Sequence, residues 1–248
     1  MKYSILIRTR NEAKWLPVLF ERLAMQTERD FEVIVVDSGS TDNTVEIARA
    51  HGAHVIEIAP AIFTLPHSLN IAAAAAKTEN YLVLLSAHSL PMGKDWLASA
   101  APHFNDEKLA GVYGPVFPLP HATIADHFFL GCGRLVNVFK RPGIFVESKA
   151  QYGTLGFTNA VIRKDLWNQH HFNEAYAGGG EDTEWAAHFM ALGYHVVYDR
   201  ALSAQHSHNL SVFGWLKQLA YWRRTSAAPT TFEQLTFRKD GAYKPLTK

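Results

Sequence analysis

The stretch YLVLLSAHSLP, residues 81–91, sets the fold that we predict for this chain. Residues 81–85 are apolar without alternation, which is typical of a strand buried on both faces of a mostly parallel sheet. Small and polar residues follow, and Pro91 ends regular pairing. Ligands of an open α/β sheet bind beyond the carboxyl ends of its strands, so we expect a diphosphate-containing ligand near Ser86 and His88. That His88 only completes a buried turn is an equally good interpretation of this stretch alone.

Further strands surround this one in the sequence, at residues 3–7, 32–36 and 54–58. Helices are expected between them, because apolar residues recur at helical spacing after residue 15 and an alanine-rich segment covers residues 68–77. Asn43 and Glu46 have capping-box spacing at the start of another helix. Alternating strands and helices predict an α/β fold: one domain with a Rossmann-like, mostly parallel central sheet flanked by helices.

The second half of the chain has a different character. It contains predicted strands at residues 109–117, 160–163 and 194–198, and an apolar segment at 124–135 without a clear pattern. A basic, aromatic amphipathic helix is expected at 212–224, followed by a loosely ordered tail after residue 227. Val212, Trp215, Leu216, Leu219 and Trp222 share one face of this helix, opposite Lys217, Tyr221 and Arg224. Three interpretations of such a face are open: it packs on its own domain, it forms a dimer interface, or it contacts a membrane.

Bulk composition excludes several classes of protein. A chain of 248 residues with a formal net charge of +1 and no long basic run is not a dedicated nucleic-acid binder. The one cysteine, Cys132, cannot form an internal disulfide, which favours a reducing compartment. No apolar run reaches the length of a membrane span or of a signal peptide. We therefore expect a cytoplasmic protein, at most peripheral on the inner face of a membrane.

Two polar turns end predicted strands at the same sheet edge as His88. Asp37 follows the second strand, where a carboxylate can bind a base or ribose, although it could also cap the next helix. The turn after the first strand, Thr9 to Glu12, could grip a nucleotide with its backbone, or be an ordinary connecting loop.

Glu181 and Asp182 form the predicted acid–base site. These adjacent carboxylates follow Gly178 to Gly180 and begin a helix, whose positive N-terminal end stabilises negative charge. This effect alone is sufficient to explain acidic residues at these positions. The glycines, however, suit a mobile loop that closes on a substrate, and a carboxylate there can take a proton from an attacking hydroxyl.

His206 and His208 are two residues apart, so an extended segment places both on one face, within reach of His88 if the chain returns to the sheet edge. Imidazoles bind borderline divalent metals or, when charged, stabilise a departing phosphate. Since the chain has 13 histidines, chance pairs are also expected. The fingerprints of Rossmann dehydrogenases, P-loop proteins, zincins and α/β-hydrolases are absent from the sequence.

Taken together, an ordered set of segments resembles the family-2 glycosyltransferases, which have the A-type glycosyltransferase fold. The segments are SILIRTRNEAKWLPVLFERL (4–23), FEVIVVDSGSTDNTVEIA (31–48), LVLLSAHSLPMGKDWL (82–97), GFTNAVIRKDLW (156–167), GGGEDTEWAAHFMALGYHVVYD (178–199) and HSH (206–208). The resemblance implies Asp182 as the catalytic base, with Glu181 beside it. The resemblance and the strand-end argument together give the candidate nucleotide-binding residues Thr9, Asn11, Glu12, Asp37, Asn70, Ser86 and His88.

One departure from the family bears on metal binding. Ser86-Ala87-His88 stands where the family usually has an acidic D-x-D motif that holds a divalent cation on the diphosphate, and a subgroup with S-A-H is similar to this chain. The candidate metal ligands are therefore His88, His206 and His208. Such ligands favour a manganese-type cation over magnesium, or the charged His88 replaces the cation.

The resemblance implies an inverting transfer of a sugar from a nucleotide-sugar donor to an acceptor hydroxyl on a glycan or lipid-linked sugar, in bacterial surface glycan assembly. The expected domain covers residues 1–208, with a nucleotide half (1–108) and an acceptor half (109–208), and residues 209–248 form the terminal helix and tail. The alternatives are a nucleotidyltransferase on a similar sheet and an inactive sugar-nucleotide or glycan-binding module.

Overall fold

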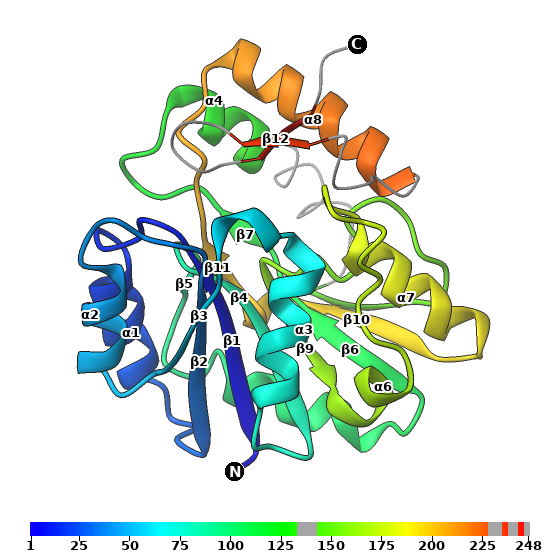
Figure 1. Cartoon of the computed structure of the whole chain (residues 1–248). Helices are drawn as coiled ribbons and strands as arrows, with labels where there is room; N and C mark the ends of the chain where they lie inside the picture. The colour runs from blue at the N-terminus through cyan, green and yellow to red at the C-terminus, as the bar shows by residue number, and fades with distance from the viewer. Residues whose placement is uncertain (133–142, 228–234, 238–242, 246–248) are drawn as a thin grey trace.

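The structure, a computed structural model, describes residues 1–132, 143–227, 235–237 and 243–245 and is built around an eight-stranded sheet (Figure 1). The strand order is β3-β2-β1-β4-β9-β6-β10-β8. The strands are β1 (Tyr3–Thr9), β2 (Phe31–Asp37), β3 (His54–Glu57), β4 (Tyr81–Ser86), β6 (Leu109–Tyr113), β8 (Ile144–Glu147), β9 (Asn159–Arg163) and β10 (His195–Asp199). Strands β3, β2, β1 and β4 pair in parallel, as do β6 and β10, whereas β9 and β8 run antiparallel to their neighbours. The α/β class and the single domain with a mostly parallel sheet are confirmed.

The expected division into two halves does not produce two separate sheets. Strand β9, from the acceptor half, pairs with β4 of the nucleotide half on one side and with β6 on the other. The two halves therefore share one continuous sheet, as parts of one domain, and the boundary at residue 108 stays a prediction.

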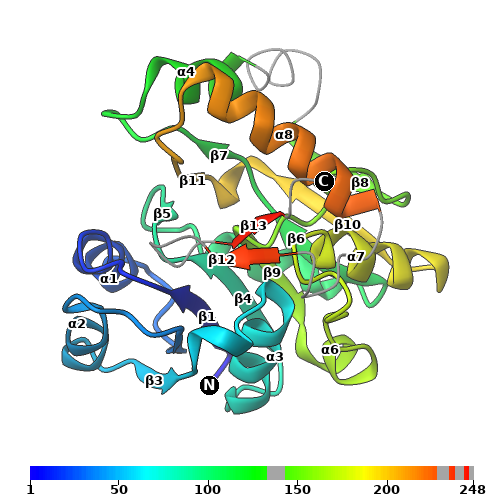
Figure 2. The ribbon, with the colours of Figure 1, turned by 45° about the horizontal axis from the view of Figure 1, so that its top comes forward.

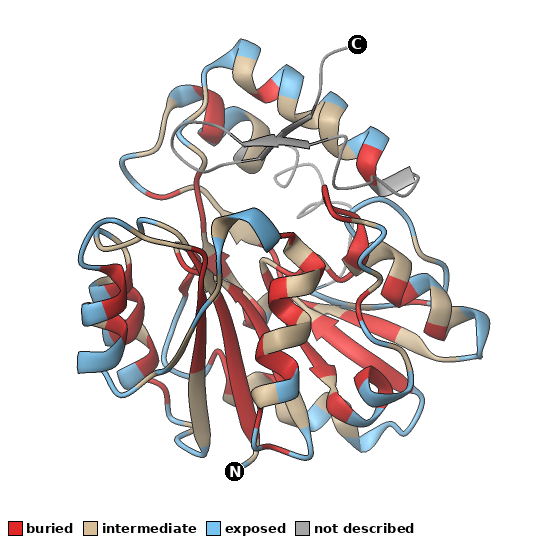
Figure 3. Cartoon of the chain, viewed as in Figure 1, coloured by how far each residue is buried: buried red, intermediate tan, exposed pale blue. Residues whose placement is uncertain are grey.

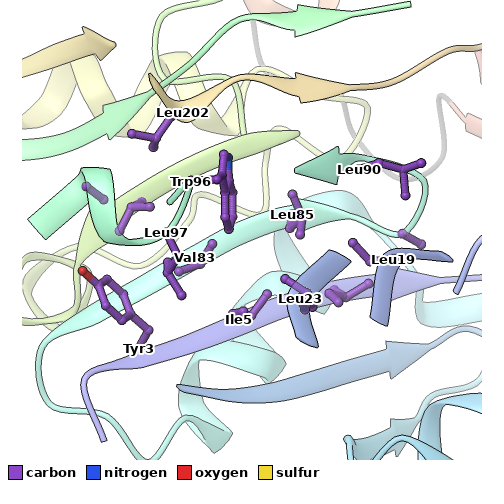
Figure 4. Close-up of a cluster of buried hydrophobic side chains, with 14 of the residues drawn as sticks. Tyr3, Ile5, Leu19, Leu23, Val83, Leu85, Leu90, Trp96, Leu97 and Leu202 are labelled. Atoms are coloured by element: carbon purple, nitrogen blue, oxygen red, sulfur yellow. The ribbon is translucent and has the colours of Figure 1, made fainter. Parts of the chain in front are cut away.

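Helices cover both faces of this sheet. They are α1 (Leu16–Ala24), α2 (Thr44–Ala50), α3 (Leu65–Ala75), α6 (Lys164–Gln169) and α7 (Glu181–Ala191), with the short 3-10 helices η1 (Pro60–Ile62), η2 (Ala98–Asn105) and η4 (Arg200–Leu202). Helices α1, α2 and η2 pack in one hydrophobic cluster, drawn in part in Figure 4, and α3, α6 and α7 pack in the other. The central strands are consequently buried almost throughout (Figure 3).

Strand β4 has the double burial that its sequence predicts. Val83 and Leu85 point into the cluster under α1, while Leu82 and Leu84 point into the cluster under α3. Each of these side chains is at most 2% exposed. An unbroken apolar run is required here because neither face of the strand meets water.

Three local predictions need correction. Asn43 makes no side-chain cap on α2, and Asp42 Oδ1 instead accepts the N–H of Thr44 at 3.1 Å, so the capping box is wrong. The expected strand 109–117 is broken after residue 113, because Pro115 lacks an N–H for strand pairing. Gly114, which has no Cβ, allows the carbonyl of Leu202 to approach closely at the break. The expected helix over 68–77 begins earlier, since Thr64 caps it through the N–H of His67.

A second layer lies beyond the carboxyl ends of β1 and β4 (Figures 1 and 2). It contains α4 (Ile124–Asp126), the π-helix η3 (His127–Cys132) and α8 (Val212–Ala227). A small sheet, in the order β5 (Leu90–Pro91), β11 (Ala204–Gln205) and β7 (Val116–Phe117), connects this layer to the main sheet. The apolar segment 124–135 thus begins as α4 and η3, and its last residues lie outside the described ones.

The chain after α8 is described only at β12 (Leu235–Phe237) and β13 (Tyr243–Pro245), which pair antiparallel. The rest of the expected tail lies outside the described residues. Among the helices that the structure describes, none combines the length and the apolar character needed to cross a membrane.

Candidate active site

A cavity of about 540 Å³ opens at the carboxyl edge of the sheet, between the main domain and α8. Both predicted catalytic carboxylates line it, together with His206, His208 and Arg8. The position agrees with the general rule for α/β sheets, in which ligands bind beyond the strand ends. Residues from both halves of the chain form its wall.

Glu181 and Asp182 begin helix α7 and lie on this wall. Two glycines precede them with left-handed backbone, Gly179 at a φ of +117° and Gly180 at +101°, which other residues rarely adopt. The sharp turn that results places both carboxylates at the positive end of the helix. The backbone N–H of Thr183 donates to Asp182 Oδ1 at 2.6 Å, and the backbone of Phe157 donates a further bond to the same carboxylate.

Burial changes the acidity of this pair. Burial, together with the neighbouring charge of Asp182, raises the pKa of Glu181 to about 7, against the opposing charge of Arg8. Burial also raises the pKa of Asp182, against the stabilising bonds from the Thr183 and Phe157 backbone. A carboxylate with a raised pKa is a stronger base than an exposed one, as general base catalysis near neutral pH requires.

The glycine loop before this pair is covered in the structure, and its closure on a substrate stays a prediction. Gly178, Gly179 and Gly180 are buried. The hydroxyl of Tyr221, on α8, donates to the carbonyl of Gly178 at 2.8 Å. Helix α8 therefore holds the loop from above, and Trp222 of the same helix lines the cavity.

The structure brings together the three predicted metal-ligating histidines, although His88 follows β4 and the other two follow β11. One ring nitrogen of each lies within 4.8 Å of the others. The rings of His88 and His206 are stacked at 4.5 Å, and Nε2 of His206 is 3.3 Å from Nε2 of His208. This set of three imidazoles suits a borderline divalent ion better than magnesium, which prefers oxygen ligands.

Neighbouring polar groups orient two of the three rings. Glu12 Oε1 lies 3.0 Å from Nδ1 of His88, and this contact orients the ring with Nε2 on the side away from the carboxylate. The hydroxyl of Ser89 lies 3.0 Å from Nδ1 of His206. Burial and the neighbouring His88 lower the pKa of His208 to about 4, so its ring is neutral at pH 7. Metal-binding histidines commonly have such orienting partners.

The predicted nucleotide-binding turns after β1 and β2 are bonded to each other. Thr9 Oγ1 donates to Asp37 Oδ2 at 2.8 Å. The backbone N–H groups of Gly39 and Ser40 donate to Asp37 Oδ1, and the Ser40 hydroxyl donates to Oδ2. Asp37 is 1% exposed and thus shapes its own loop. Its contact with a base or ribose stays a prediction.

Asn11 and Glu12 complete the same pair of turns. Asn11 has a φ of +54°, and its side-chain oxygen accepts the N–H of Thr41 at 2.8 Å. The N–H of Glu12 donates to Thr44 Oγ1 at 2.7 Å, while its side chain reaches His88. Glu12 thus connects the turn after β1 to the histidine cluster.

The two remaining candidates differ in position. Ser86 ends β4, two residues before His88, and its carbonyl accepts the N–H of Ser89 at 2.9 Å. Asn70 lies within α3 and does not line the cavity; its amide nitrogen donates to the carbonyl of Phe172, and its amide oxygen accepts from Trp167. Neither residue lines the cavity: Ser86 lies at the strand end that leads to His88, whereas Asn70 is bonded to the segment around Phe172.

Sequence reasoning missed Arg8. It directly follows the strand expected at residues 3–7, but the structure includes it in β1, and its side chain lines the cavity beside Glu181. The signal available was a charged residue directly after an unbroken apolar run, which does not by itself distinguish a turn from a buried site.

Residues 4–131 match the family model described as Glycosyl transferase family 2. The O-antigen chain rhamnosyltransferase WbaN of Salmonella anatum is 28% identical over 216 residues, covering 84% of this chain and 66% of that protein. The O-antigen chain rhamnosyltransferase RfbN of Salmonella typhimurium is 26% identical over 218 residues, covering 84% and 67%. The chain thus spans about two thirds of the length of these relatives.

Solved structures share the fold. A mannosyltransferase from Pyrobaculum calidifontis, in complex with GDP-Man and Mn²⁺, aligns with a TM-score of 0.64 and 21% identity, over 83% of this chain and 56% of its own. S. aureus TarS in complex with UDP-GlcNAc aligns with a TM-score of 0.58 and 18% identity, over 85% and 60%. At these identities the likeness concerns the fold alone.

Proposed function

Since the chain belongs to glycosyl transferase family 2, we propose that it transfers a sugar from a nucleotide-sugar donor to an acceptor hydroxyl. The observation that carries the proposal is the position of Asp182. This carboxylate is held by two backbone N–H groups at the start of α7 and lines a cavity whose wall also includes His206 and His208. A base and a group suited to a diphosphate therefore face one space.

The proposed reaction is a single displacement that inverts the anomeric centre. Asp182 takes the proton from the acceptor hydroxyl while the acceptor oxygen forms its bond to the anomeric carbon. The bond between that carbon and the phosphate oxygen breaks, and the nucleoside diphosphate leaves with the electron pair. Glu181, next to Asp182, completes the carboxylate pair and is proposed to contact the substrate.

We propose His88, His206 and His208 as the ligands of a divalent cation, manganese in preference to magnesium. The support is the donor set itself, three imidazole nitrogens within 4.8 Å, together with the contacts that Glu12 and Ser89 make to the outer nitrogens of two rings. A bound cation would neutralise charge on the departing diphosphate. The residues of this chain orient the rings, with Glu12 in contact with the ring of His88.

For the nucleotide, we propose that the joined turns after β1 and β2 bind the nucleoside, with Thr9, Asn11, Glu12 and Asp37 shaping them. These turns lie at the carboxyl ends of adjacent parallel strands, where the edge of the sheet offers backbone groups to a ligand. Ser86 lies at the neighbouring strand end and connects this region to His88.

The acceptor is proposed to be a glycan or lipid-linked sugar of bacterial surface glycan assembly, because the two relatives are named as O-antigen chain rhamnosyltransferases. Helix α8 supports contact with a membrane that carries such an acceptor. Val212, Phe213 and Leu216 are 54–65% exposed on its outer face, near the exposed Lys217. A cytoplasmic location at the inner face of the membrane stays a prediction, as does a homodimer through this helix.

The proposal is tested with a panel of nucleotide sugars, by measuring which of them stabilises the protein against heat and which releases free nucleoside diphosphate. Asp182→Asn is expected to lower turnover by about two orders of magnitude or more, because it removes the general base. Donor binding should stay close to that of the wild type, because the base acts on the acceptor. The thermal shift with donor is the control that the variant folds.

Other outcomes would identify other functions. Full activity of Asp182→Asn would contradict its role and move the base to another residue. Release of pyrophosphate in place of nucleoside diphosphate would indicate a nucleotidyltransferase. Donor binding without any turnover, with a range of glycan acceptors supplied, would indicate a binding module.

A further inference from the structure

Arg8 is a charged residue in the cavity wall that the reaction above does not use. Its side chain is 15% exposed. Its Nη1 atom is buried and makes no hydrogen bond with any residue in the described part of the chain. A buried guanidinium N–H without an acceptor is costly. A ligand that enters the cavity and supplies an oxygen to this nitrogen would remove the cost.

The charged groups that face Arg8 decide which kind of oxygen fits. Nη1 lies 3.8 Å from Oε1 of Glu181, too far for a hydrogen bond, and Asp182 also acts on Arg8 electrostatically. Each of these carboxylates is negative when it is ionised. A phosphate oxygen would therefore be attracted by Arg8 but repelled by the carboxylates beside it. A neutral hydroxyl has neither difficulty, because it accepts from Arg8 and donates to Glu181.

The geometry allows one hydroxyl to make both bonds. Hydrogen bonds of about 2.8 Å from a single oxygen can reach two atoms that are 3.8 Å apart. The strands fix where that hydroxyl would lie. Arg8 pairs in register with Ser86 of β4, two residues before His88, and Glu181 is next to the proposed base. The pair thus adjoins the proposed base, on the strand next to the one that leads to His88, in the cavity wall that a donor sugar would contact.

We propose that Arg8 and Glu181 together bind a hydroxyl group of the sugar on the nucleotide donor, and so contribute to the choice of that sugar. The inference rests on the proposed glycosyl transfer. Arg8 donates from Nη1 and Glu181 accepts at Oε1, so the two side chains recognise the hydroxyl as acceptor and donor at once. A donor whose sugar lacks that hydroxyl would leave Nη1 unpaired and would be discriminated against.

The test compares binding of a nucleotide with and without its sugar. Calorimetric Kd values are measured for UDP, GDP and dTDP and for the same nucleotides carrying a hexose, with the wild type, Arg8→Met and Arg49→Met. Methionine keeps the length of the stem without the charge. Arg49 is the matched control, since its Nη2 donates to Glu57 at the surface and it does not line the cavity.

The affinity that the sugar adds is the ratio of the nucleoside diphosphate Kd to the nucleotide-sugar Kd. For the nucleotide sugar that binds the wild type, Arg8→Met should lower this ratio by about tenfold. The Kd of the nucleoside diphosphate alone should not change, and Arg49→Met should change neither value. Glu181→Gln is a second variant and is expected to lower the same ratio. The amide replaces one of the two acceptor oxygens of the carboxylate with an N–H donor.

If Arg8→Met loses the same affinity for the nucleoside diphosphate as for the nucleotide sugar, Arg8 binds phosphate. If it loses affinity for neither ligand, Arg8 contacts neither of them. Both results overturn the inference. If Arg8→Met does not fold, an unchanged ratio in Glu181→Gln overturns it. If the wild type binds no nucleoside diphosphate in the panel, the proposed function itself fails, and this inference fails with it.

Discussion

At the scale of single residues, the chemistry of this protein depends on two adjacent carboxylates that share a buried position. Glu181 and Asp182 cannot both ionise as easily as exposed acids, because burial disfavours each charge and each charge disfavours the other. Arg8 offsets part of this cost from 3.8 Å. The local electrostatics therefore favour a pair that gains and loses protons near neutral pH.

The raised pKa of Glu181 predicts how stability depends on pH. Burial raises the pKa of Glu181 from 4.5 to about 7, so the folded protein keeps a proton that the unfolded chain releases as pH rises between these values. The free energy of unfolding should therefore decrease as pH rises across this window, and stop decreasing above it. At about 1.4 kcal/mol per pKa unit, the contribution is on the order of 3 kcal/mol.

Chemical denaturation of the wild type and of Glu181→Gln at several pH values checks this. The stability of the wild type relative to the variant should decrease from pH 4.5 to pH 7. Glu46→Gln, at an exposed position of α2, is the control and should follow the wild type. Parallel curves for the wild type and Glu181→Gln would contradict the assignment.

At the scale of elements, helix α8 has two faces with different roles, and the single apolar face predicted from its sequence is wrong. Trp215 is 1% exposed and its Nε1 donates to Asp126 at 2.6 Å, whereas Val212 and Leu216, predicted on the same face, are more than half exposed. Trp215 connects the inner face of α8 to α4, and Tyr221 connects it to the glycine loop. The outer face is exposed and available for contact with a partner.

Two aromatic residues of α8 should consequently behave in opposite ways. Trp215→Glu buries a charge beside Asp126 and should cost about 3 kcal/mol or more in the free energy of unfolding. Phe213→Glu, at a position that is 65% exposed, should leave stability nearly unchanged and abolish binding to liposomes. Thermal melts and co-sedimentation with anionic and neutral vesicles measure both effects.

Binding of the wild type should be stronger to anionic vesicles and should weaken with salt, because charges on the helix are screened. If Phe213→Glu sediments with vesicles as the wild type does, the outer face is not the membrane contact. If the variant instead changes a dimer to a monomer in analytical ultracentrifugation, the face is a subunit interface.

At the scale of the whole molecule, the histidine cluster joins segments that are distant in sequence. His88 follows a strand of the main sheet, and His206 and His208 follow the small sheet that leads to α8. An ion bound by all three would therefore connect the main sheet to the second layer. Binding to the folded state alone raises stability in proportion to the logarithm of the free ion concentration.

Manganese should accordingly raise the melting temperature of the wild type, and magnesium should raise it much less, because imidazole ligands disfavour magnesium. His206→Ala should lose the manganese effect, whereas His54→Ala, at an exposed position of β3, should keep it. Strict dependence of both stability and activity on magnesium, without rescue by manganese, would contradict the proposed ligand set.

The sequence by itself determined the features that depend on neighbouring residues. The unbroken apolar run of β4 requires burial on both faces, and the glycines before Glu181 allow the turn that begins α7. The strand ends then mark the ligand edge, because parallel strands align their carboxyl ends. Family resemblance pointed to the same carboxylate pair.

Only the tertiary structure decided which of these features meet. The periodicity of apolar residues predicts that a helix such as α8 has an apolar side, but not which neighbouring element covers it. The sequence therefore could not indicate that Trp215 is buried and Leu216 exposed. Arg8 is buried because β1 lies between two strands of the sheet and α7 packs above its end. The histidine cluster likewise forms because β11 pairs with β5, directly after the loop of His88, and strand pairing across a long loop leaves no local pattern in the sequence.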